Sequence, residues 1–188
     1  DCVEMTAAMA GERGIQIACE LSERLVVKAD YMRFKQVVLN LISNAIKYNH
    51  DNGTVEVSVS TAGDDKVRVG VKDTGIGIPE DRATEVFLPF ARLLPVETEG
   101  TGIGLTISKQ LVEAMHGEIG FVSRKGEGSE FWFTLPRCHG AGQHTSPLQP
   151  VKPGLTRTPE TSSEPQRVVL YIEDNPASVE LMRNVLAR

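Results

Sequence analysis

Alternating valines constrain the fold of this chain more than any other feature. In each of the segments 54–60 and 66–72, every second residue is a valine: Val55, Val57, Val59, Val67, Val69 and Val71. Because successive side chains of a strand point to opposite faces of a sheet, each segment predicts a strand with one buried face. The connector 61–65 is short, polar and contains a glycine, so the two strands are expected to form an antiparallel hairpin.

A helix is predicted before this hairpin. Asp30 is a suitable N-cap, and the apolar residues of 30–48 recur in steps of three and four, at Phe34, Val37, Val38, Leu41, Ile42 and Ala45. Further helices are predicted over 2–12 and 103–116, the second stopped by Gly117, and further strands over 15–21, 25–28, 118–124 and 129–135. These elements predict an α/β fold over 1–136, a two-layer α/β sandwich whose mixed, mostly antiparallel sheet packs on helices.

Composition changes after residue 136. Proline, glycine, serine and threonine are frequent in 137–166, which predicts a linker. Order is expected again in 167–188, where an apolar strand is followed by Glu173 and Asp174 and then by a short helix. One strand and one helix bury too little surface to fold alone, so this tail is expected to be disordered, misfolded or docked on the first domain.

Charge and hydropathy exclude several classes of partner. The net charge is −5 and no basic run is present, so no nucleic acid is expected as a partner. No stretch approaches the roughly 20 apolar residues that cross a bilayer, so no direct membrane contact is expected. The three cysteines are scattered, which predicts no disulfide framework and suits the cytoplasm.

One polar group lies on the helix predicted over 30–48. Asn40, Asn44, Lys47 and Tyr48 are spaced so that they share a face, beside the apolar one. Amide oxygens suit Mg²⁺, and a lysine ammonium suits phosphate. The ordinary polar side of an amphipathic helix explains the same residues equally well.

Two glycine-rich segments follow. In Asp73-Thr-Gly-Ile-Gly-Ile-Pro79, glycines let the backbone approach a flat ligand, and the carboxylate can accept from the amino group of adenine. A glycine-rich turn without a ligand is the alternative. In 99–105, Glu-Gly-Thr-Gly-Ile-Gly-Leu, the N–H groups at a helix start form an anion site. This segment is neither a dinucleotide fingerprint, because no parallel βαβ unit surrounds it, nor a P-loop, because no Lys-Ser/Thr follows.

In this order, the three groups resemble the N, G1 and G2 boxes of the sensor histidine kinase catalytic domain. That family shares a superfamily with type II topoisomerases, Hsp90 chaperones and MutL repair proteins. The resemblance covers residues 1–136: 36–48 looks like the N box, 73–79 like the G1 box, 87–92 like the F box and 100–105 like the G2 box. It implies the Bergerat ATP-binding fold, with ATP and Mg²⁺ as cofactors.

The resemblance also implies roles for individual residues. Asn44 would bind Mg²⁺, while Asn40 and Lys47 would serve the phosphates, and these three would be catalytic. Asp73 would accept from adenine, and 80–99 would form a lid anchored by Phe87 and Phe90. The remaining nucleotide-binding set would be Tyr48, Gly75, Gly77, Ile78, Phe90, Arg92, Gly100, Thr101, Gly102, Ile103, Gly104 and Leu105.

Asn40 separates a kinase from its hydrolytic relatives. Those relatives place a glutamate four residues before the Mg²⁺-binding asparagine, as general base for water, whereas this chain has Asn40 there. Slow hydrolysis is therefore expected, which fits transfer of the γ-phosphoryl group to a histidine. An ATP-driven conformational module and a degenerate scaffold that binds no nucleotide are the alternatives.

The expected partners lie outside the first domain. A phosphoacceptor histidine of this family sits on a helix and precedes Glu or Asp. Here only His50 precedes an acidic residue, and His50 lies in the turn after the N box. The acceptor is therefore expected on a separate dimerisation and phosphoacceptor domain, and this chain is expected to be a monomer that does not autophosphorylate. Glu173 and Asp174 resemble the acidic pair of a receiver domain, which implies a hybrid kinase.

Overall fold

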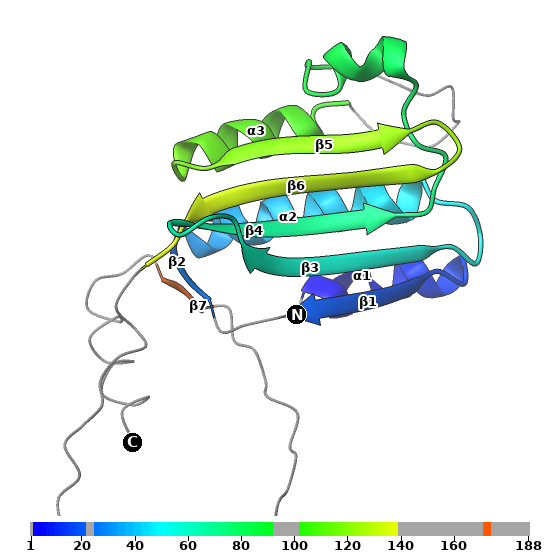
Figure 1. The fold of residues 1–188 in the computed structure, drawn as a ribbon. Helices are drawn as coiled ribbons and strands as arrows, with labels where there is room; N and C mark the ends of the chain where they lie inside the picture. The colour runs from blue at the N-terminus through cyan, green and yellow to red at the C-terminus, as the bar shows by residue number, and fades with distance from the viewer. Residues whose placement is uncertain (1, 22–24, 92–101, 139–170, 174–188) are drawn as a thin grey trace, which may run out of the picture.

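The computed structural model describes residues 2–21, 25–91, 102–138 and 171–173, the last as backbone only (Figure 1). The N-terminal half contains α1 (Cys2–Glu12), β1 (Gln16–Leu21), β2 (Val26–Lys28), α2 (Tyr31–Lys47), β3 (Thr54–Thr61) and β4 (Lys66–Asp73). These are followed by the 3₁₀ helix η1 (Glu80–Glu85), α3 (Gly104–Ala114), β5 (Glu118–Arg124), β6 (Gly128–Pro136) and β7 (Tyr171–Glu173).

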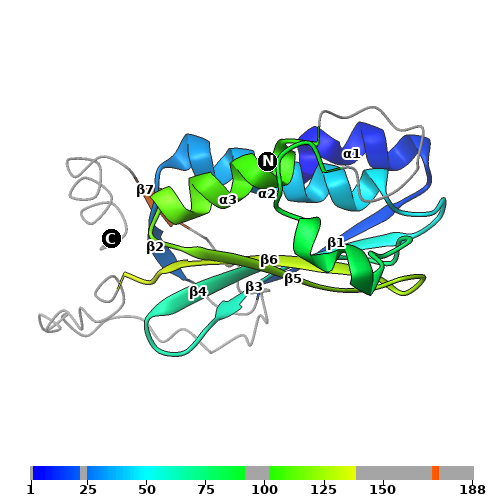
Figure 2. The same ribbon diagram turned by 90° about the horizontal axis from the view of Figure 1, so that it is seen from above.

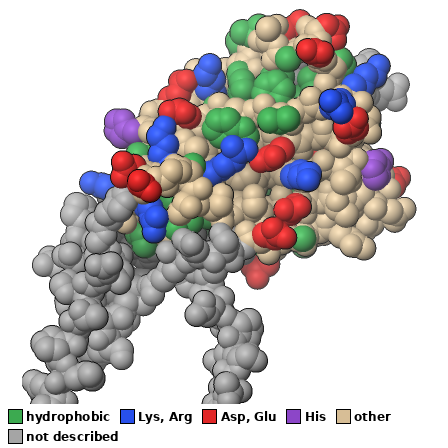
Figure 3. Space-filling model, viewed as in Figure 1, with side chains coloured by type: hydrophobic (Ala, Val, Ile, Leu, Met, Phe, Trp, Pro, Cys, Tyr) green, Lys and Arg blue, Asp and Glu red, His purple; other side chains and the backbone are tan. Residues whose placement is uncertain are grey.

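Five strands form the main sheet, in the order β1-β3-β4-β6-β5. β1 runs parallel to β3, and the other neighbours are antiparallel. The three α-helices cover one face of this sheet (Figure 2). On the open face, side chains of both charges are interspersed (Figure 3). The predicted two-layer sandwich with a mixed, mostly antiparallel sheet is therefore confirmed.

The valine hairpin forms as predicted. β3 and β4 pair so that Val57 lies opposite Val71 and Val59 opposite Val69, and all six alternating valines are buried. α2 packs on them through its apolar face, and its Phe34 ring meets Phe133 edge to face at 5.6 Å. Asp30 caps this helix, because its side chain accepts from the N–H of Arg33 at 3.0 Å. These contacts fix the helix that carries the polar group predicted to bind phosphate.

The end of α3 differs from the prediction. The helix stops at Ala114, and the left-handed residue that ends it is His116, with φ 61°, rather than Gly117. The N–H of Gly117 closes the turn by donating to Val112 O at 2.9 Å. Glycine is needed at 117 for a different reason, because a Cβ there would overlap with the carbonyl oxygen of Thr134 on β6.

β2 lies outside the main sheet. It pairs in parallel with β7, and Val27 also forms an antiparallel bridge with Arg137. Only the backbone of 171–173 is described in the tail, so the predicted acidic pair cannot be placed: Asp174 and the Glu173 side chain lie outside the described residues. Most of the predicted linker, from 139 to 166, lies outside them as well.

Candidate functional site

The Asp73 carboxylate is buried at the end of β4, where it is only 6% exposed. Its Oδ1 accepts from the N–H groups of Gly75 at 2.8 Å and Ser129 at 3.2 Å. Burial raises the pKa of Asp73, and these two hydrogen bonds act in the opposite direction. Among the described residues no donor binds Oδ2. The carboxylate is thus held rigidly by one oxygen while the other is available to a ligand.

Close backbone approaches shape the loop that follows Asp73. A Cβ on Gly75 would overlap with the carbonyl oxygen of Tyr48, and one on Gly77, which has φ 62°, would overlap with that of Arg124. Ile76 N donates to Tyr48 O at 3.1 Å, and Ile78 N donates to Ser123 Oγ at 2.8 Å. The loop is therefore clamped between the end of α2 and the β5–β6 hairpin, as a rigid wall of the site.

Replacing Gly77 by alanine tests this wall. A left-handed alanine costs about 1–2 kcal/mol by itself, and the overlap with Arg124 adds to that cost. Gly63 is the matched control, because it has φ 69° but nothing within 4 Å of an added Cβ. In thermal unfolding, we expect Gly77→Ala to lower Tm clearly more than Gly63→Ala. Equal losses would mean that the loop yields without strain.

Ser123 and Ser129 support the site, although they belong to none of the motifs in the sequence. They are paired across β5 and β6, with their hydroxyl oxygens 2.9 Å apart. Ser129 holds Asp73 through its N–H, and Ser123 holds Ile78 through its hydroxyl. The pairing of two distant strands with the end of β4 creates this arrangement, so the only signal available in the sequence is the alternation along the hairpin.

The polar face of α2 meets the start of α3. Asn40 Nδ2 donates to Ser108 Oγ at 2.8 Å, and Ser108 is only 1% exposed. A Cβ on Gly104 would lie 2.5 Å from Asn40 Oδ1, so a larger residue where the two helices touch would displace the Asn40 amide. Asn44 lies one turn further along α2 and is half-buried, and no described residue forms a hydrogen bond with its side chain.

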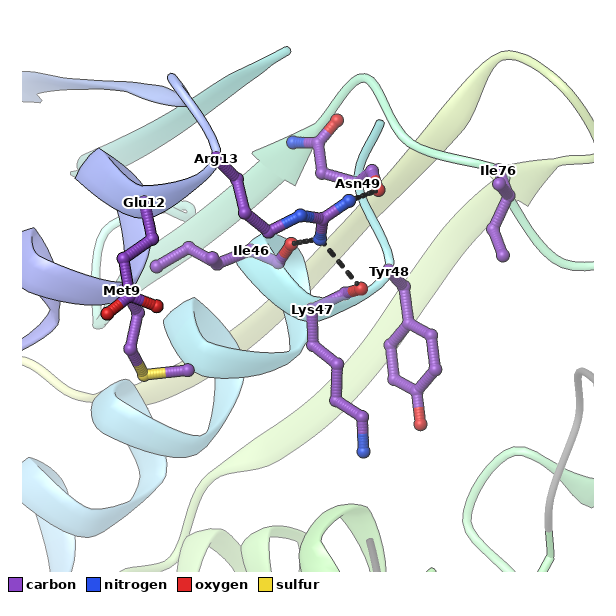
Figure 4. A pocket seen from close by; sticks show the side chains of 8 residues that line it. All are labelled: Met9, Glu12, Arg13, Ile46, Lys47, Tyr48, Asn49 and Ile76. Carbon is purple, nitrogen blue, oxygen red and sulfur yellow. Dashed lines mark hydrogen bonds between the residues drawn. The ribbon is translucent and has the colours of Figure 1, made fainter. Parts of the chain in front are cut away.

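Lys47 and Tyr48 end the same helix face. The Lys47 ammonium lies 5.3 Å from the centre of the Tyr48 ring, and both side chains extend in the same direction (Figure 4). The four polar residues predicted to share a face thus follow one another over the last turns of α2 and its C-cap: Asn40, Asn44, Lys47 and Tyr48.

The lid predicted over 80–99 is described only in its first part. The described residues on either side of 92–101 meet where Phe90 N donates to Gly102 O at 3.0 Å, with Phe90 and Gly102 both in the left-handed region. Phe87 packs on Phe121 at 6.0 Å, and its carbonyl accepts from Thr106. The Phe90 ring, in contrast, is 75% exposed, and among the described residues Phe90 is held to Gly102 through its backbone.

Several predicted G2-box and F-box residues are placed only in part. Arg92, Gly100 and Thr101 lie outside the described residues. Ile103 precedes α3, and Leu105 packs partly against the hydrophobic core. Gly102 and Gly104 are at the lid base and at the α2–α3 contact, respectively.

A hollow of about 350 Å³ opens beside the end of α2. It shares Lys47 and Tyr48 with the predicted site and Ile76 with the loop after Asp73, and α1 forms its other side (Figure 4). Asn40, Asn44 and Asp73 do not line it. The hollow therefore adjoins the predicted nucleotide site and is not identical with it.

The donor chemistry fits a magnesium nucleotide. Asp73 offers a rigid acceptor for an amino group, and Asn44 offers a hard amide oxygen on α2. Within the described part of the chain, no cluster of three or more His, Cys, Asp or Glu residues could hold a metal. A cation here would therefore depend on Asn44 together with phosphate oxygens of the ligand. None of the described helices has the length and apolar character to span a membrane.

The chain matches a known family model. The model for histidine kinase-, DNA gyrase B- and HSP90-like ATPases matches residues 29–139, which include every described residue of the site.

Individual relatives agree with this match. The adaptive-response sensory kinase SasA of Prochlorococcus marinus is 42% identical over 139 residues, which cover 72% of this chain and 36% of SasA. The sensory/regulatory protein RpfC of Xanthomonas campestris pv. campestris is 37% identical over 188 residues, which cover 94% of this chain and 25% of RpfC. This chain therefore spans about a third or less of these curated relatives.

A solved structure is similar as well. Full-length ShkA in complex with AMPPNP has a TM-score of 0.64 and 36% sequence identity, over 72% of this chain and 28% of the ShkA chain. This likeness confirms the predicted fold class.

Proposed function

Because this chain belongs to the family of histidine kinase-, DNA gyrase B- and HSP90-like ATPases, we propose that its first domain binds MgATP. We propose further that it transfers the γ-phosphoryl group to a histidine on a separate dimerisation and phosphoacceptor domain. The ATP part is supported by ShkA, which was crystallised with AMPPNP. The kinase part is supported by relatives named as sensory kinases, such as SasA.

Asn40 is the observation that carries the choice of phosphoryl transfer. Its amide donates to Ser108 Oγ at 2.8 Å and abuts Gly104, so its position is fixed where α2 and α3 touch. An amide cannot take a proton from water as a carboxylate does. An ATP-driven conformational module would need such a base, and the proposal therefore favours a kinase over that alternative.

Each remaining residue has a distinct task in this proposal. Asp73 accepts from the adenine amino group, and Tyr48 lies against the nucleotide. Asn44 holds Mg²⁺ on the phosphates, and the ion would neutralise their charge. Lys47 contributes a positive charge beside them, and Gly102 and Gly104 allow the backbone to approach them.

We also propose the wider architecture of a cytoplasmic hybrid kinase in a phosphorelay. The similarity to RpfC extends over 94% of this chain, and therefore beyond the first domain into the linker and the tail. The proposed domains are 1–136, a linker over 137–166 and a receiver fragment over 167–188, in which Glu173 and Asp174 would be the acidic pair. The partners are the phosphoacceptor domain and the receiver domain, and the chain by itself is monomeric.

Calorimetric titration with AMPPNP, with and without Mg²⁺, tests the nucleotide site. Binding that strengthens with Mg²⁺ is the expected result. A folded chain that binds no AMPPNP at millimolar concentration would favour the scaffold alternative instead.

Labelled ATP then tests the reaction. Acid-labile phosphate is expected only after a dimerisation and phosphoacceptor domain is added, with little phosphate release from this chain alone. Steady release of phosphate from the chain alone would point to the ATPase module. Acid-labile phosphate on His50, which lies in the loop after α2, would contradict the separate acceptor.

A further inference from the structure

Arg13 binds the end of α2 from outside the predicted site. This residue follows α1, and its guanidinium donates to the carbonyl oxygens of Ile46 at 2.7 Å, Lys47 at 3.1 Å and Asn49 at 2.7 Å (Figure 4). The same side chain also contacts Asp51 at 3.0 Å. One side chain thus connects the α1–β1 turn to three carbonyls of the last turn of α2 and the loop after it.

These carbonyls belong to a helix end that needs such donors. The last carbonyls of an α-helix have no partner within the helix, and a cation near them is favoured by the helix dipole. Guanidinium is suited to this role, because its planar fork presents several donors at once. The carbonyl between them, Tyr48 O, accepts from Ile76 N at 3.1 Å. The end of α2 is therefore held from one side by Arg13 and from the other by the loop after Asp73.

The segment held in this way carries the side chains proposed to contact the nucleotide. Lys47 and Tyr48 project from the backbone whose neighbouring carbonyls Arg13 binds, and Gly75 packs against Tyr48 O. A shift of this backbone would move the phosphate-side ammonium and the Tyr48 ring together. Misplacement of binding groups by as little as about 1 Å can cost much of their effect.

We infer that Arg13 is a positioning residue for nucleotide binding, because it sets the orientation of Lys47 and Tyr48. It does so from the side of α2 opposite the loop after Asp73. The inference rests on the proposed nucleotide site. Arg13 does not touch the nucleotide, and it acts through the backbone of residues 46–49.

The test is calorimetric titration of the 188-residue chain and its Arg13→Gln variant with AMPPNP and Mg²⁺. We expect Arg13→Gln to raise Kd about tenfold, which corresponds to about 1.4 kcal/mol, with a stoichiometry that stays near that of the unmodified chain. A purely structural role predicts the opposite pattern, because partial unfolding lowers the stoichiometry and leaves the Kd of the folded molecules unchanged.

Two further variants separate the contacts of Arg13. Asp51→Asn removes only the ion pair to an exposed carboxylate and leaves the three carbonyl contacts, so an unchanged Kd is expected. Arg13→Lys keeps the cation but has a single donor nitrogen, so partial rescue is expected, with a Kd between those of Arg and Gln. If Arg13→Gln does not fold, Arg13→Lys decides. An Arg13→Lys variant with the same Kd as the unmodified chain would overturn the inference.

The outcomes also separate this inference from the proposed function. If the unmodified chain binds AMPPNP and Arg13→Gln binds it with the same Kd, only the role of Arg13 is overturned. If the unmodified chain binds no AMPPNP, both fall together.

Discussion

Asp73→Asn is expected to weaken ATP binding by roughly 100-fold or more while leaving the fold intact. Asparagine keeps an oxygen for the N–H groups of Gly75 and Ser129, which now bind Asp73 Oδ1 at 2.8 and 3.2 Å. It then places an NH₂ group where the second carboxylate oxygen stood, and this group faces the adenine amino group donor to donor. Calorimetric titration with AMPPNP measures the loss.

Base preference distinguishes this explanation from general damage. The new NH₂ group can donate to the guanine carbonyl, so Asp73→Asn should shift the ratio of affinities from the adenine towards the guanine nucleotide. Asp64→Asn is the matched control, since Asp64 is an exposed carboxylate in the connector between β3 and β4, and no change is expected. An unchanged preference for adenine in Asp73→Asn would contradict the assigned contact.

The thermal stability of the Asp73→Asn variant should not fall with its affinity for ATP. Burial raises the pKa of Asp73 above its ordinary value of 3.8, so the folded chain binds this proton more tightly than the unfolded chain. The contribution of Asp73 to stability is therefore full below the unfolded pKa and is lost as the pH rises through the folded pKa. At neutral pH the buried charge opposes folding. We therefore expect Asp73→Asn to have an unchanged or higher Tm at pH 7, and a lower Tm would show that the charge itself stabilises the fold.

The same shift sets the pH dependence of binding. Protonation converts the acceptor carboxylate into a carboxylic acid, so adenine affinity should fall on acidification at a pH above the ordinary aspartate range. The ratio of the wild-type Kd to the Asp73→Asn Kd isolates this effect, because the nucleotide and the other side chains titrate equally in both proteins.

Asn44→Ala is expected to remove the strengthening of ATP binding by Mg²⁺ and to reduce phosphoryl transfer by roughly 100-fold or more. Asn44 lies half-buried on the α2 face that also carries Asn40, and no described side chain competes for its amide. Binding without Mg²⁺ should change little, because the adenine contact at Asp73 is retained. The measurements are titrations with and without Mg²⁺, and phosphotransfer to an added phosphoacceptor domain.

Neighbouring variants control for damage to α2. Ser43→Ala removes the side chain that precedes Asn44, whose hydroxyl donates to Asn40 O at 3.1 Å within its own helix, so near-normal Mg²⁺ dependence is expected. Asn44→Asp keeps an oxygen ligand and should retain part of that dependence. Strengthening by Mg²⁺ that persists in Asn44→Ala would remove Asn44 from the metal site.

Local sequence patterns were sufficient to predict the main secondary-structure elements and the family of this protein. The alternation of Val55 to Val71 predicted the hairpin, the spacing of Phe34 to Ala45 predicted the buried face of α2, and both are confirmed. The order of the asparagine and glycine motifs predicted the family, which the match over 29–139 confirms. The residue roles within the site remain predictions. Such patterns succeed because periodicity and glycine placement are properties of neighbouring residues along the chain.

Only the tertiary structure decided which distant residues hold that site together. Ser129 reaches Asp73, Ser108 reaches Asn40, and Arg13 reaches the end of α2, across 56, 68 and more than 30 positions of sequence, respectively. The reason is physical: strand register and helix packing set these contacts, and neither leaves a periodic signal at the residues concerned. The sequence by itself determined the elements and the chemical groups they carry, while folding determined which backbone and side-chain donors orient them.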